Sequence, residues 1–422
     1  MISVEEALAY ILKHFHPLEA ERVLMLDALD RVLAEDIVAD DNVPPFDNSA
    51  MDGYAVRAED IAGASAQQPV TLRVIGDVAA GYTAPRAVER GTAMRIMTGA
   101  PLPAGADTVV RFEETSEGVE ARAAGKNHDT VDILKAIQRG ENVRAAGEDI
   151  HAGEVVLLKG TIVRAAEIGV MASLGKEVVS VHRRPRVAIL ATGDELVAID
   201  EPIAPGKIRN SNEYSNAAAV LKAGGIPIRL GIGRDNIDDL TAKIRAGLDA
   251  NADLFLTSAG VSVGDYDMVK DVLNAEGEMH FWQVKMKPGK PLAFGVLRGN
   301  AEHRRDVPLL GLPGNPVSAM ISFEVFARPA ILTMLGKTRL TRPSVRATLL
   351  EDVENTANRR NFTRVVVEKR DGGYTARTTG EQGSGILTSV SRANGLLVIP
   401  EDVTLVRKGE TMDVQMLDWP EW

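Results

Sequence analysis

The most constraining feature of this sequence is the alternation of strand-like and helix-like runs between residues 183 and 335. The runs RVAILATG, IPIRLGIG and DLFLTS are short and apolar and end at Gly or polar residues, which is typical of buried strands. Residues 211–225 and 236–250 carry helical patterns between them, and Pro316 begins a long apolar-faced helix. Strands that alternate with helices of about 10–15 residues predict a doubly wound, mostly parallel sheet.

The sequence on either side of this region has a β-like pattern. Runs such as VTLRVIGDV and DTVVRFEET are bounded by turn residues, and short alternating strands recur after residue 342. Helices are predicted at residues 3–15, with Ser3 as the cap, and at 20–29. The chain is therefore expected to be an α/β and β multi-domain protein. Its predicted domains are 1–50 with 143–182 (discontinuous and mixed), 51–142 (inserted, β-rich), 183–335 (central α/β) and 336–422 (small C-terminal β-barrel).

Composition excludes several kinds of site. The chain has no Cys, which rules out disulfides, thiol nucleophiles, Cys–zinc sites and iron–sulfur clusters. A net charge of −11 argues against non-specific nucleic-acid binding, which needs many cationic side chains. The N-terminus lacks the basic and apolar regions of a signal peptide, and no apolar run approaches the roughly 18 residues expected of a membrane helix. We therefore expect a cytoplasmic protein without nucleic-acid or membrane partners.

Four segments follow or precede the predicted strands at the edge where an open α/β sheet binds ligands. Glycines allow backbone N–H groups to face a ligand, and a following helix N-terminus favours negative charge. Lysines add mobile positive charge. The segments therefore predict a site for a phosphate-like anion. They are ATGDEL (191–196), TSAGVSVGDYD (257–267), KMKPGKP (285–291) and GLPGNP (311–316).

The same segments carry carboxylates, which would repel a bare anion. A divalent cation between the two is expected, and Mg²⁺ suits oxygen ligands and substrate phosphates. Each segment also has a simpler structural interpretation. Asp194 and Asp235 could cap helices, and KPGKP could be a plain surface turn. Asp52 and Asp149 could stabilise turns. The four segments occurring together favour the ligand site.

These motifs, with SNE, PPFDNSAMDGYAV, MTGAPLPAGADTVVRFEET, VRAAGEDIHAGE and GSGILTSVSRANGLLVIPE, resemble the molybdopterin molybdenumtransferases, the MoeA family, over nearly the whole chain. A metazoan relative is the C-terminal part of gephyrin. The catalytic positions that the resemblance implies are Asp52, Thr98, Asp149, Glu195, Asp235, Asp267 and Lys287, and the implied cation ligands are Glu195, Asp235 and Asp267. The implied substrate-binding positions are Gly193, Ser258, Gly260, Ser262, Gly264, Lys290, Pro313, Asn315, Pro316, Arg359 and Ser384.

The resemblance implies the last step of molybdenum cofactor assembly. Such an enzyme takes adenylylated molybdopterin and molybdate as substrates, releases AMP and places molybdenum on the dithiolene, with Mg²⁺ assisting. It further implies a homodimer whose active cleft is shared between subunits, with the molybdopterin adenylyltransferase and downstream molybdoenzymes as candidate partners. Two alternatives stay open: the preceding adenylylation of molybdopterin, and a non-catalytic scaffold like gephyrin.

Two departures from the family pattern bear on the site. Gln283 stands where the family often has lysine, so either Lys285 substitutes for it or the anion pocket has one charge fewer. Residues 298–307, RGNAEHRRDV, are hydrophilic and are expected to form a surface loop without a role.

Overall fold

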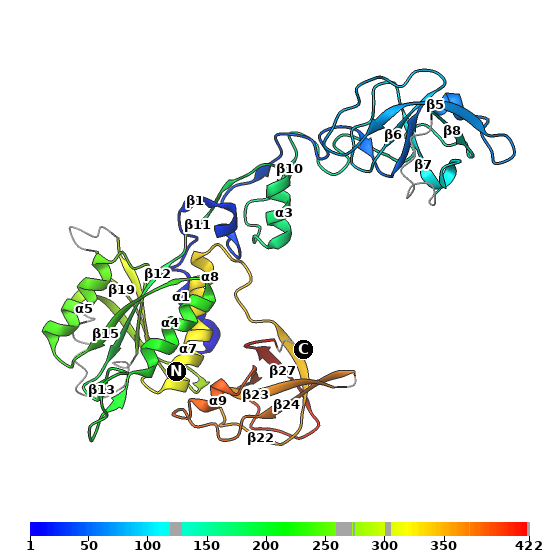
Figure 1. Cartoon of the computed structure of the whole chain (residues 1–422). Helices are drawn as coiled ribbons and strands as arrows, with labels where there is room; N and C mark the ends of the chain where they lie inside the picture. Colours follow the sequence, from blue (N-terminus) through cyan, green and yellow to red (C-terminus); the bar gives the residue numbers. More distant parts are fainter. Residues whose placement is uncertain (119–128, 259–271, 273–274, 300–304, 371, 420–422) are drawn as a thin grey trace. The chain divides into compact units, whose positions relative to one another are not determined.

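The computed structural model describes residues 1–118, 129–258, 272, 275–299, 305–370 and 372–419. Its contacts divide the chain into two compact units, coloured along the sequence in Figure 1. The first unit contains residues 1–23, 30–34 and 180–422, and the second contains residues 24–29 and 35–179.

The first unit is built on a six-stranded sheet in the order β15-β12-β16-β20-β19-β17. Strands β12, β15 and β19 of this sheet are labelled in Figure 1. The first four strands are parallel, and the last two are antiparallel to their neighbours. This arrangement confirms the predicted doubly wound sheet. The strands are β12 (Arg186–Thr192), β15 (Ile226–Gly233), β16 (Leu254–Ser258), β17 (Gly277–Gln283), β19 (Pro291–Leu297) and β20 (Val307–Leu312).

Helices cover both faces of this sheet. Val187 and Ile189 of β12 pack in one core with α4 (Ser211–Ala223), whereas Ala188 and Leu190 pack in another with α5 (Ile237–Asp249). Side chains of a strand alternate between faces, so burial of both faces explains why the strands read as continuous apolar runs.

The long helix predicted at Pro316 is present in three parts: α7 (Pro316–Ser322), a π-helical turn η4 (Phe323–Ala327) and α8 (Arg328–Met334). Within the part of the chain that the structure describes, residues 316–334 are the one helical run long and apolar enough to cross a membrane by length and composition. Of its most apolar window, 72% is buried inside the fold, as expected of a core helix.

The C-terminal part of the first unit is the predicted small barrel. Its sheet closes because β25 pairs both with β27 and with β23. A short strand, β18 (Met286–Lys287), adds in parallel to β23 and joins the lysine-bearing segment to the barrel. The barrel strands are β21 (Ser344–Leu349), β23 (Arg360–Arg370), β24 (Gly373–Thr378), β25 (Gly395–Ile399) and β27 (Thr411–Met416).

The second unit contains the predicted β-rich insertion as a five-stranded sheet in the order β7-β4-β6-β5-β8. A short pairing of β3 (Asn48–Ser49) with β9 (Val143–Arg144) brings together the two chain segments that flank the insertion. The unit also holds α3 (Ala165–Ser173) and β10 (Val155–Leu157), which pairs with β2 (Ile37–Val38). The sheet strands are β4 (Gly53–Val56), β5 (Val70–Val78), β6 (Thr92–Ile96), β7 (Thr108–Arg111) and β8 (Thr130–Ile133).

The two helices predicted near the N-terminus had different outcomes. Helix α1 (Val4–Leu12) begins at Ser3, whose hydroxyl accepts from the Glu6 amide in a capping box, as predicted. The helix predicted at 20–29 is wrong, because that segment forms β1 (Ala20–Leu24) and a 3₁₀ turn, η1 (Met25–Ala28). Strand β1 pairs with β11 (Val178–His182), a partner far along the chain that local periodicity does not reveal.

Candidate active site

A cleft of about 880 Å³ lies where the carboxyl edge of the central sheet meets the C-terminal barrel. Eight of the positions expected from the sequence line it together. They are Glu195, Lys287, Lys290, Pro313, Asn315, Pro316, Arg359 and Ser384. The sheet topology explains this convergence, because the ends of β12 and β20 and the start of antiparallel β19 all fall at the same edge.

Gly193 allows the chain to turn sharply at the end of β12. Its φ is +136°, and a Cβ atom there would come within 2.2 Å of the Glu195 carboxylate. The turn is held by hydrogen bonds from the Leu196 amide to the Gly193 carbonyl (3.2 Å) and from the Ile208 amide to the Glu195 carbonyl (2.8 Å). A residue other than glycine would therefore displace the carboxylate that reaches the cleft.

Asp235 is attached to the same turn from the neighbouring strand β15. The Asp194 amide donates to the Asp235 carboxylate and the Asp235 amide donates to the Asp194 carboxylate, each at 3.3 Å. The interpretation of Asp235 as a helix cap is wrong, because Asn236 caps α5 by accepting from the Asp239 amide at 2.8 Å. Asp235 is thus free of the capping role and lies beside the turn that carries Glu195.

The KPGKP segment is more than a plain surface turn. Gly289 is buried with φ +101°, and a Cβ atom there would come within 2.7 Å of the Ser322 hydroxyl on the long helix. Lys287 donates to the Thr356 hydroxyl at 3.1 Å, and the Lys290 carbonyl accepts from the Val284 amide at 2.8 Å. The close contact with the helix fixes the backbone from which both lysines reach the cleft.

The PGNP segment carries the start of α7 to the cleft. Pro313 is buried, and the Gly314 carbonyl accepts from the Asn212 side chain at 2.7 Å. The Val317 amide donates to the Ser384 carbonyl at 3.1 Å, which ties the helix start to the barrel. Because α7 continues into η4 and α8, the first turn belongs to a long helix whose N-terminal dipole favours anions.

The lining of the cleft is positively charged, although the whole chain carries a net charge of −11. Among the described lining residues, Lys287, Lys290 and Arg359 are cationic and Glu195 is the one carboxylate. A local excess of positive charge beside one carboxylate is suited to an oxyanion ligand.

The remaining positions expected from the sequence lie elsewhere. Asp52 accepts from both the amide and the hydroxyl of Thr98 at 2.8 Å each, so the structure brings these two together in the second unit. Asp149 is exposed in that unit. Ser258 is buried at the end of β16, where its carbonyl accepts from Thr192 at 3.3 Å. Gly260, Ser262, Gly264 and Asp267 lie outside the described residues.

Lys285, considered above as a substitute for the lysine absent at position 283, lies beside the N-terminus of the chain. Its amide donates to the Ile2 carbonyl at 2.8 Å, its charge acts on Glu6, and it is not part of the described cleft lining. Gln283 pairs with Pro291 in the β17–β19 ladder. The described lining of the cleft contains neither Gln283 nor Lys285.

Sequence reasoning missed part of the lining. Ser318, Gln382 and Gly383 also line the cleft. Ser318 lies two residues after Pro316, in the first turn of the helix that begins there, so its position could have been predicted. For Gln382 and Gly383 the signal was the glycine-bracketed run GEQGSG, which also contains Ser384.

Within the ranges that the structure describes, no group of three or more His, Asp or Glu side chains is placed to hold a metal ion. Glu195 and Asp235 are anchored at one turn, and Asp267, the third expected ligand, falls outside those ranges. Carboxylate oxygens are the donors that Mg²⁺ prefers, so the chemistry of the two described residues fits that ion.

Comparison with known proteins covers nearly the whole chain. Residues 2–175 match the MoeA N-terminal region (domain I and II), residues 188–333 a probable molybdopterin binding domain, and residues 346–417 the MoeA C-terminal region (domain IV).

Named relatives span the same length. A molybdopterin molybdenumtransferase 2 from Mycobacterium tuberculosis is 38% identical over 98% of this chain and 99% of its own. The molybdopterin molybdenumtransferase of Bacillus subtilis is 35% identical over 99% of this chain and 96% of its own. The crystal structure of a molybdopterin biosynthesis MoeA protein from Pyrococcus horikoshii is 32% identical, with a TM-score of 0.83 over 99% of this chain and 100% of that chain. The chain belongs to the MoeA family of molybdopterin molybdenumtransferases.

Proposed function

We propose that this transferase of molybdenum cofactor biosynthesis inserts molybdenum from molybdate into adenylylated molybdopterin and releases AMP. The observation that carries the proposal is the cationic cleft at the carboxyl edge of the sheet, with Glu195 in its lining. Both substrates are oxyanions, and the cleft gathers lysine, arginine and a helix N-terminus around one space. Family membership supports the enzyme class over a scaffold or an adenylyltransferase.

In the proposed mechanism, Lys287, Lys290 and Arg359 hold the phosphate and molybdate oxygens. An oxygen of molybdate or water attacks the phosphorus of the pterin phosphate, so the phosphoanhydride bond of adenylylated molybdopterin breaks and AMP leaves. The two dithiolene sulfurs bond to molybdenum, and one molybdate oxygen leaves as water with the two thiol protons. The positive charges stabilise the negative charge that develops on the oxygens in the transition state. No side-chain nucleophile is needed, because both reacting groups come from the substrates.

A divalent cation fits the carboxylates of the site. Glu195, Asp235 and Asp267 would hold it, and when bound it would neutralise charge on the phosphate oxygens. Glu195 and Asp235 would act as oxygen ligands positioned by the turn after β12. The test is isothermal titration of the whole chain with MgCl₂, in which a Glu195→Gln variant should lose affinity for the ion. An unchanged Mg²⁺ affinity would remove Glu195 from the ligand set.

The reaction is tested by incubating the whole chain with adenylylated molybdopterin and molybdate and measuring AMP release and molybdenum incorporation. We expect both products in equal amounts. Incubation with ATP and metal-free molybdopterin is the control for adenylylation and should yield no transfer of AMP to the pterin. Absence of AMP release in the first incubation would instead favour a scaffold role.

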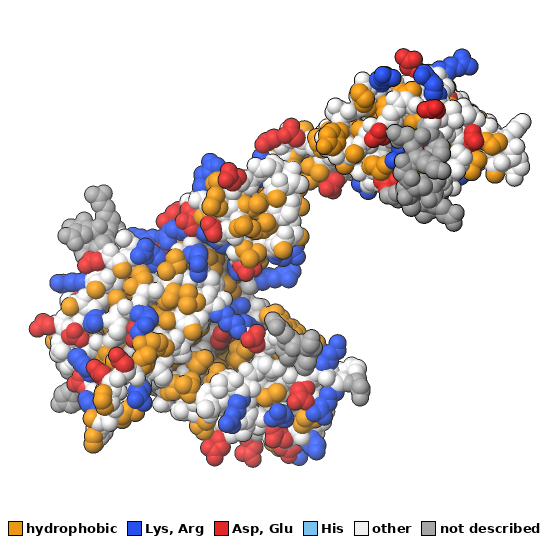
Figure 2. Space-filling model, in the orientation of Figure 1, with side chains coloured by type: hydrophobic (Ala, Val, Ile, Leu, Met, Phe, Trp, Pro, Cys, Tyr) orange, Lys and Arg blue, Asp and Glu red, His pale blue; other side chains and the backbone are white. Residues whose placement is uncertain are grey.

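We propose further that the chain acts as a cytoplasmic homodimer in which Asp52, Thr98 and Asp149 complete the cleft of the partner subunit. Support comes from exposed apolar side chains on the second unit, where Leu26 is 72% and Leu158 is 64% exposed. Figure 2 shows hydrophobic side chains at the surface of the segment that carries α3 and β10. Surfaces of this kind are typical of interfaces. The other exposed large apolar residues of the second unit include Leu24, Leu29, Val155, Ile162 and Val178.

Light scattering measures the oligomeric state directly. The unchanged chain should have the mass of a dimer, and a Leu26→Asp, Leu158→Asp double variant should have that of a monomer. Leu221→Asp is the matched control, because Leu221 is 56% exposed on the first unit and should leave the dimer intact. A monomeric unchanged chain would contradict this part of the proposal.

A further inference from the structure

The second unit contains a buried carboxylate that the proposed mechanism does not use. The side chain of Glu117 is 6% exposed. Its carboxylate accepts a hydrogen bond of 2.5 Å from the Tyr54 hydroxyl and lies 3.9 Å from Nε of Arg95. Tyr54 is itself 1% exposed, and burial together with the bond to Glu117 raises the pKa of its hydroxyl. Glu117 therefore connects two strands of the inserted sheet, because Tyr54 belongs to β4 and Arg95 to β6.

Phe112 completes this cluster and links it to Asp52. Cζ of Arg95 lies 4.8 Å from the centre of the Phe112 ring, and the Tyr54 ring meets the same ring edge to face at 5.6 Å. The Phe112 amide donates to the Asp52 carbonyl at 3.3 Å. A displacement of Phe112 is therefore transmitted to the backbone of Asp52 through one hydrogen bond.

The pairing of β4 with β6 makes a second connection between the cluster and the Asp52–Thr98 pair. Tyr54 lies opposite Arg95 in this antiparallel ladder, and Asp52 and Thr98 follow within three residues at the same end. There the Asp52 carboxylate accepts from the amide and the hydroxyl of Thr98. A slip of one residue in the register would turn Tyr54 to the other face of the sheet, away from Glu117, and would separate the pair.

Stability alone is a poor explanation for a carboxylate in this place. The loss of water by two buried charges offsets much of their attraction, and a distance of 3.9 Å between Nε and the carboxylate is too long for a hydrogen bond. The best-attested use of a buried polar group is to fix one register of chain segments over others. Glu117 is held in place for that use, because the Ser116 amide before it donates to the Asp132 carbonyl of β8 at 2.8 Å.

We propose that Glu117 is a positioning residue for the reaction. It fixes the register of β4 against β6 and the place of Phe112, and these in turn orient Asp52 and Thr98. Because Glu117 is buried, it acts on the substrate only through these residues. The inference rests on the proposed function, since it takes Asp52 and Thr98 as residues with which the second unit completes the cleft.

The experiment measures kcat and KM for AMP release by the whole chain, at a temperature where circular dichroism shows every variant to be folded. Glu117→Gln removes the charge and keeps the shape of the side chain, and Tyr54→Phe removes the hydroxyl and keeps the ring. Each should lower kcat by about 10-fold, because a displaced catalytic group loses part of its effect. KM should change by less than about twofold. The matched control is Glu89→Gln, which removes an exposed carboxylate from the same unit and should leave both constants unchanged.

A double-mutant cycle separates positioning from a purely structural role. In an Asp52→Ala background, Glu117→Gln should lower the residual kcat by less than about twofold, because the residue through which it acts is gone. A structural role predicts either an unchanged kcat for folded Glu117→Gln or the same fold loss with and without Asp52. Either result overturns the inference. If Glu117→Gln does not fold, Tyr54→Phe takes its place in the cycle, and the same two outcomes decide.

A second cycle serves if Asp52→Ala releases no measurable AMP. The Glu117→Gln, Tyr54→Phe double variant should then lose no more kcat than either single variant, because both substitutions break the same connection. Losses that multiply in the double variant overturn the inference.

Failure of this inference and failure of the proposed reaction are distinguishable. AMP release by the unchanged chain, with a normal kcat for Glu117→Gln and Tyr54→Phe, overturns the role of Glu117 alone. If Asp52→Ala keeps the full kcat, the assignment of Asp52 to the cleft is wrong and the inference is wrong with it. If the unchanged chain releases no AMP, both the reaction and the inference are wrong.

Discussion

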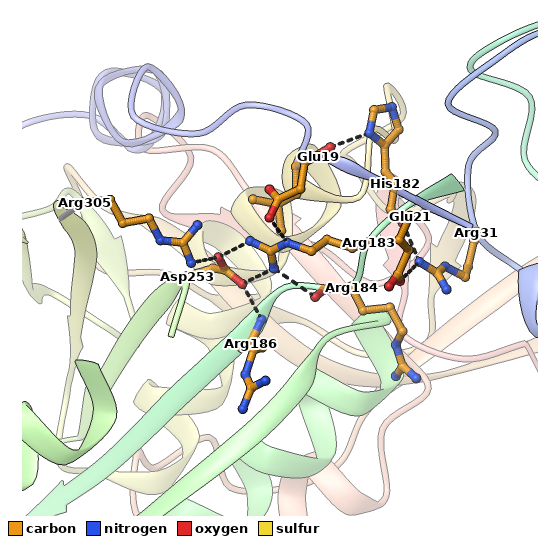
Figure 3. Close-up of polar contacts among 10 residues, drawn as sticks. Glu19, Glu21, Arg31, His182, Arg183, Arg184, Arg186, Asp253 and Arg305 are labelled. Carbon is orange, nitrogen blue, oxygen red and sulfur yellow. Dashed lines mark hydrogen bonds and ion pairs between the residues drawn. The ribbon is translucent and has the colours of Figure 1, made fainter. Parts of the chain in front are cut away.

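The two edges of the central sheet use charged side chains in opposite ways. At the amino edge, Asp253 is 6% exposed and accepts from both terminal nitrogens of Arg183 at 2.6 and 2.7 Å and from the Arg186 amide at 2.8 Å. Figure 3 shows Arg183 and Arg305 approaching Asp253 from either side. At the carboxyl edge, Lys287 is exposed, and within the described residues no carboxylate lies within ion-pair distance of it.

This difference separates charges that stabilise the fold from charges available to a ligand. Burial alone would raise the pKa of Asp253, but hydrogen bonds from Arg183 and Arg186 and the charges of Arg183 and Arg305 outweigh it, so the pKa is lowered. Hydrogen bonds to Asp253 and Glu19, and the charges of these two carboxylates, raise the pKa of Arg183. Removing one member of a buried, mutually satisfied pair destabilises the fold, whereas solvated charges at a sheet's carboxyl edge can bind substrate.

The largest effect is expected from Asp253→Ala. Removing the carboxylate leaves Arg183 largely buried without its main partner, which should cost about 3 kcal/mol of unfolding free energy. Urea denaturation monitored by circular dichroism measures the loss, and the exposed Asp413→Ala should change it by less than about 0.5 kcal/mol. Equal stability of both variants would remove the distinction between the two edges.

At the other edge, Lys287→Ala should act on the reaction and leave the fold intact. Loss of one preorganised positive group should lower kcat/KM for AMP release by about 100-fold. The melting temperature should stay unchanged, because Lys287 is exposed and its one described partner is the Thr356 hydroxyl. Lys369→Ala, an exposed lysine on β23 outside the cleft lining, should keep normal activity.

The pH dependence of stability should sharpen the contrast. The folded-state pKa of Asp253 lies below its ordinary value of 3.8, so its contribution is complete above that value and is lost as the pH falls through the folded pKa. Below about pH 4, Asp253→Asn should reduce the slope of unfolding free energy against pH by up to about 1.4 kcal/mol per pH unit. Lys287→Ala should keep the slope of the unchanged chain. If the unfolding free energies of Asp253→Asn and of the unchanged chain had the same slope against pH below about pH 4, Asp253 would not be the source of this acid-dependent stability.

The smallest effect is expected from Lys285→Ala. Lys285 lies beside Ile2 and Glu6 and outside the described cleft lining, so kcat/KM should change by less than about twofold. A loss close to that of Lys287→Ala would restore the interpretation in which Lys285 supplies the lysine that Gln283 lacks.

Local sequence patterns predicted the structure correctly where the stabilising interactions are between residues close in the sequence. Ser3 and Glu6 form the predicted capping box, and the apolar runs of β12 and β16 form buried parallel strands. Local patterns failed where the partner is distant. Residues 20–24 form a strand because residues 178–182 lie beside them, and Asp235 is bound by Asp194 across two strands. Residues 298–307 were expected to have no role, yet Arg305 among them pairs with Asp253.

The sequence by itself therefore determined the strand–helix alternation, the glycine and proline turns at the strand ends and the residue types of the cleft, because periodicity, turn chemistry and charge are properties of neighbouring residues. Only the tertiary structure decided which charges are paired and which remain open. Asp253 and Glu195 are both carboxylates next to strands, yet one meets Arg183 and the other meets a cleft. Pairing depends on which segments the fold brings within a few ångströms, and the chain order does not contain that distance.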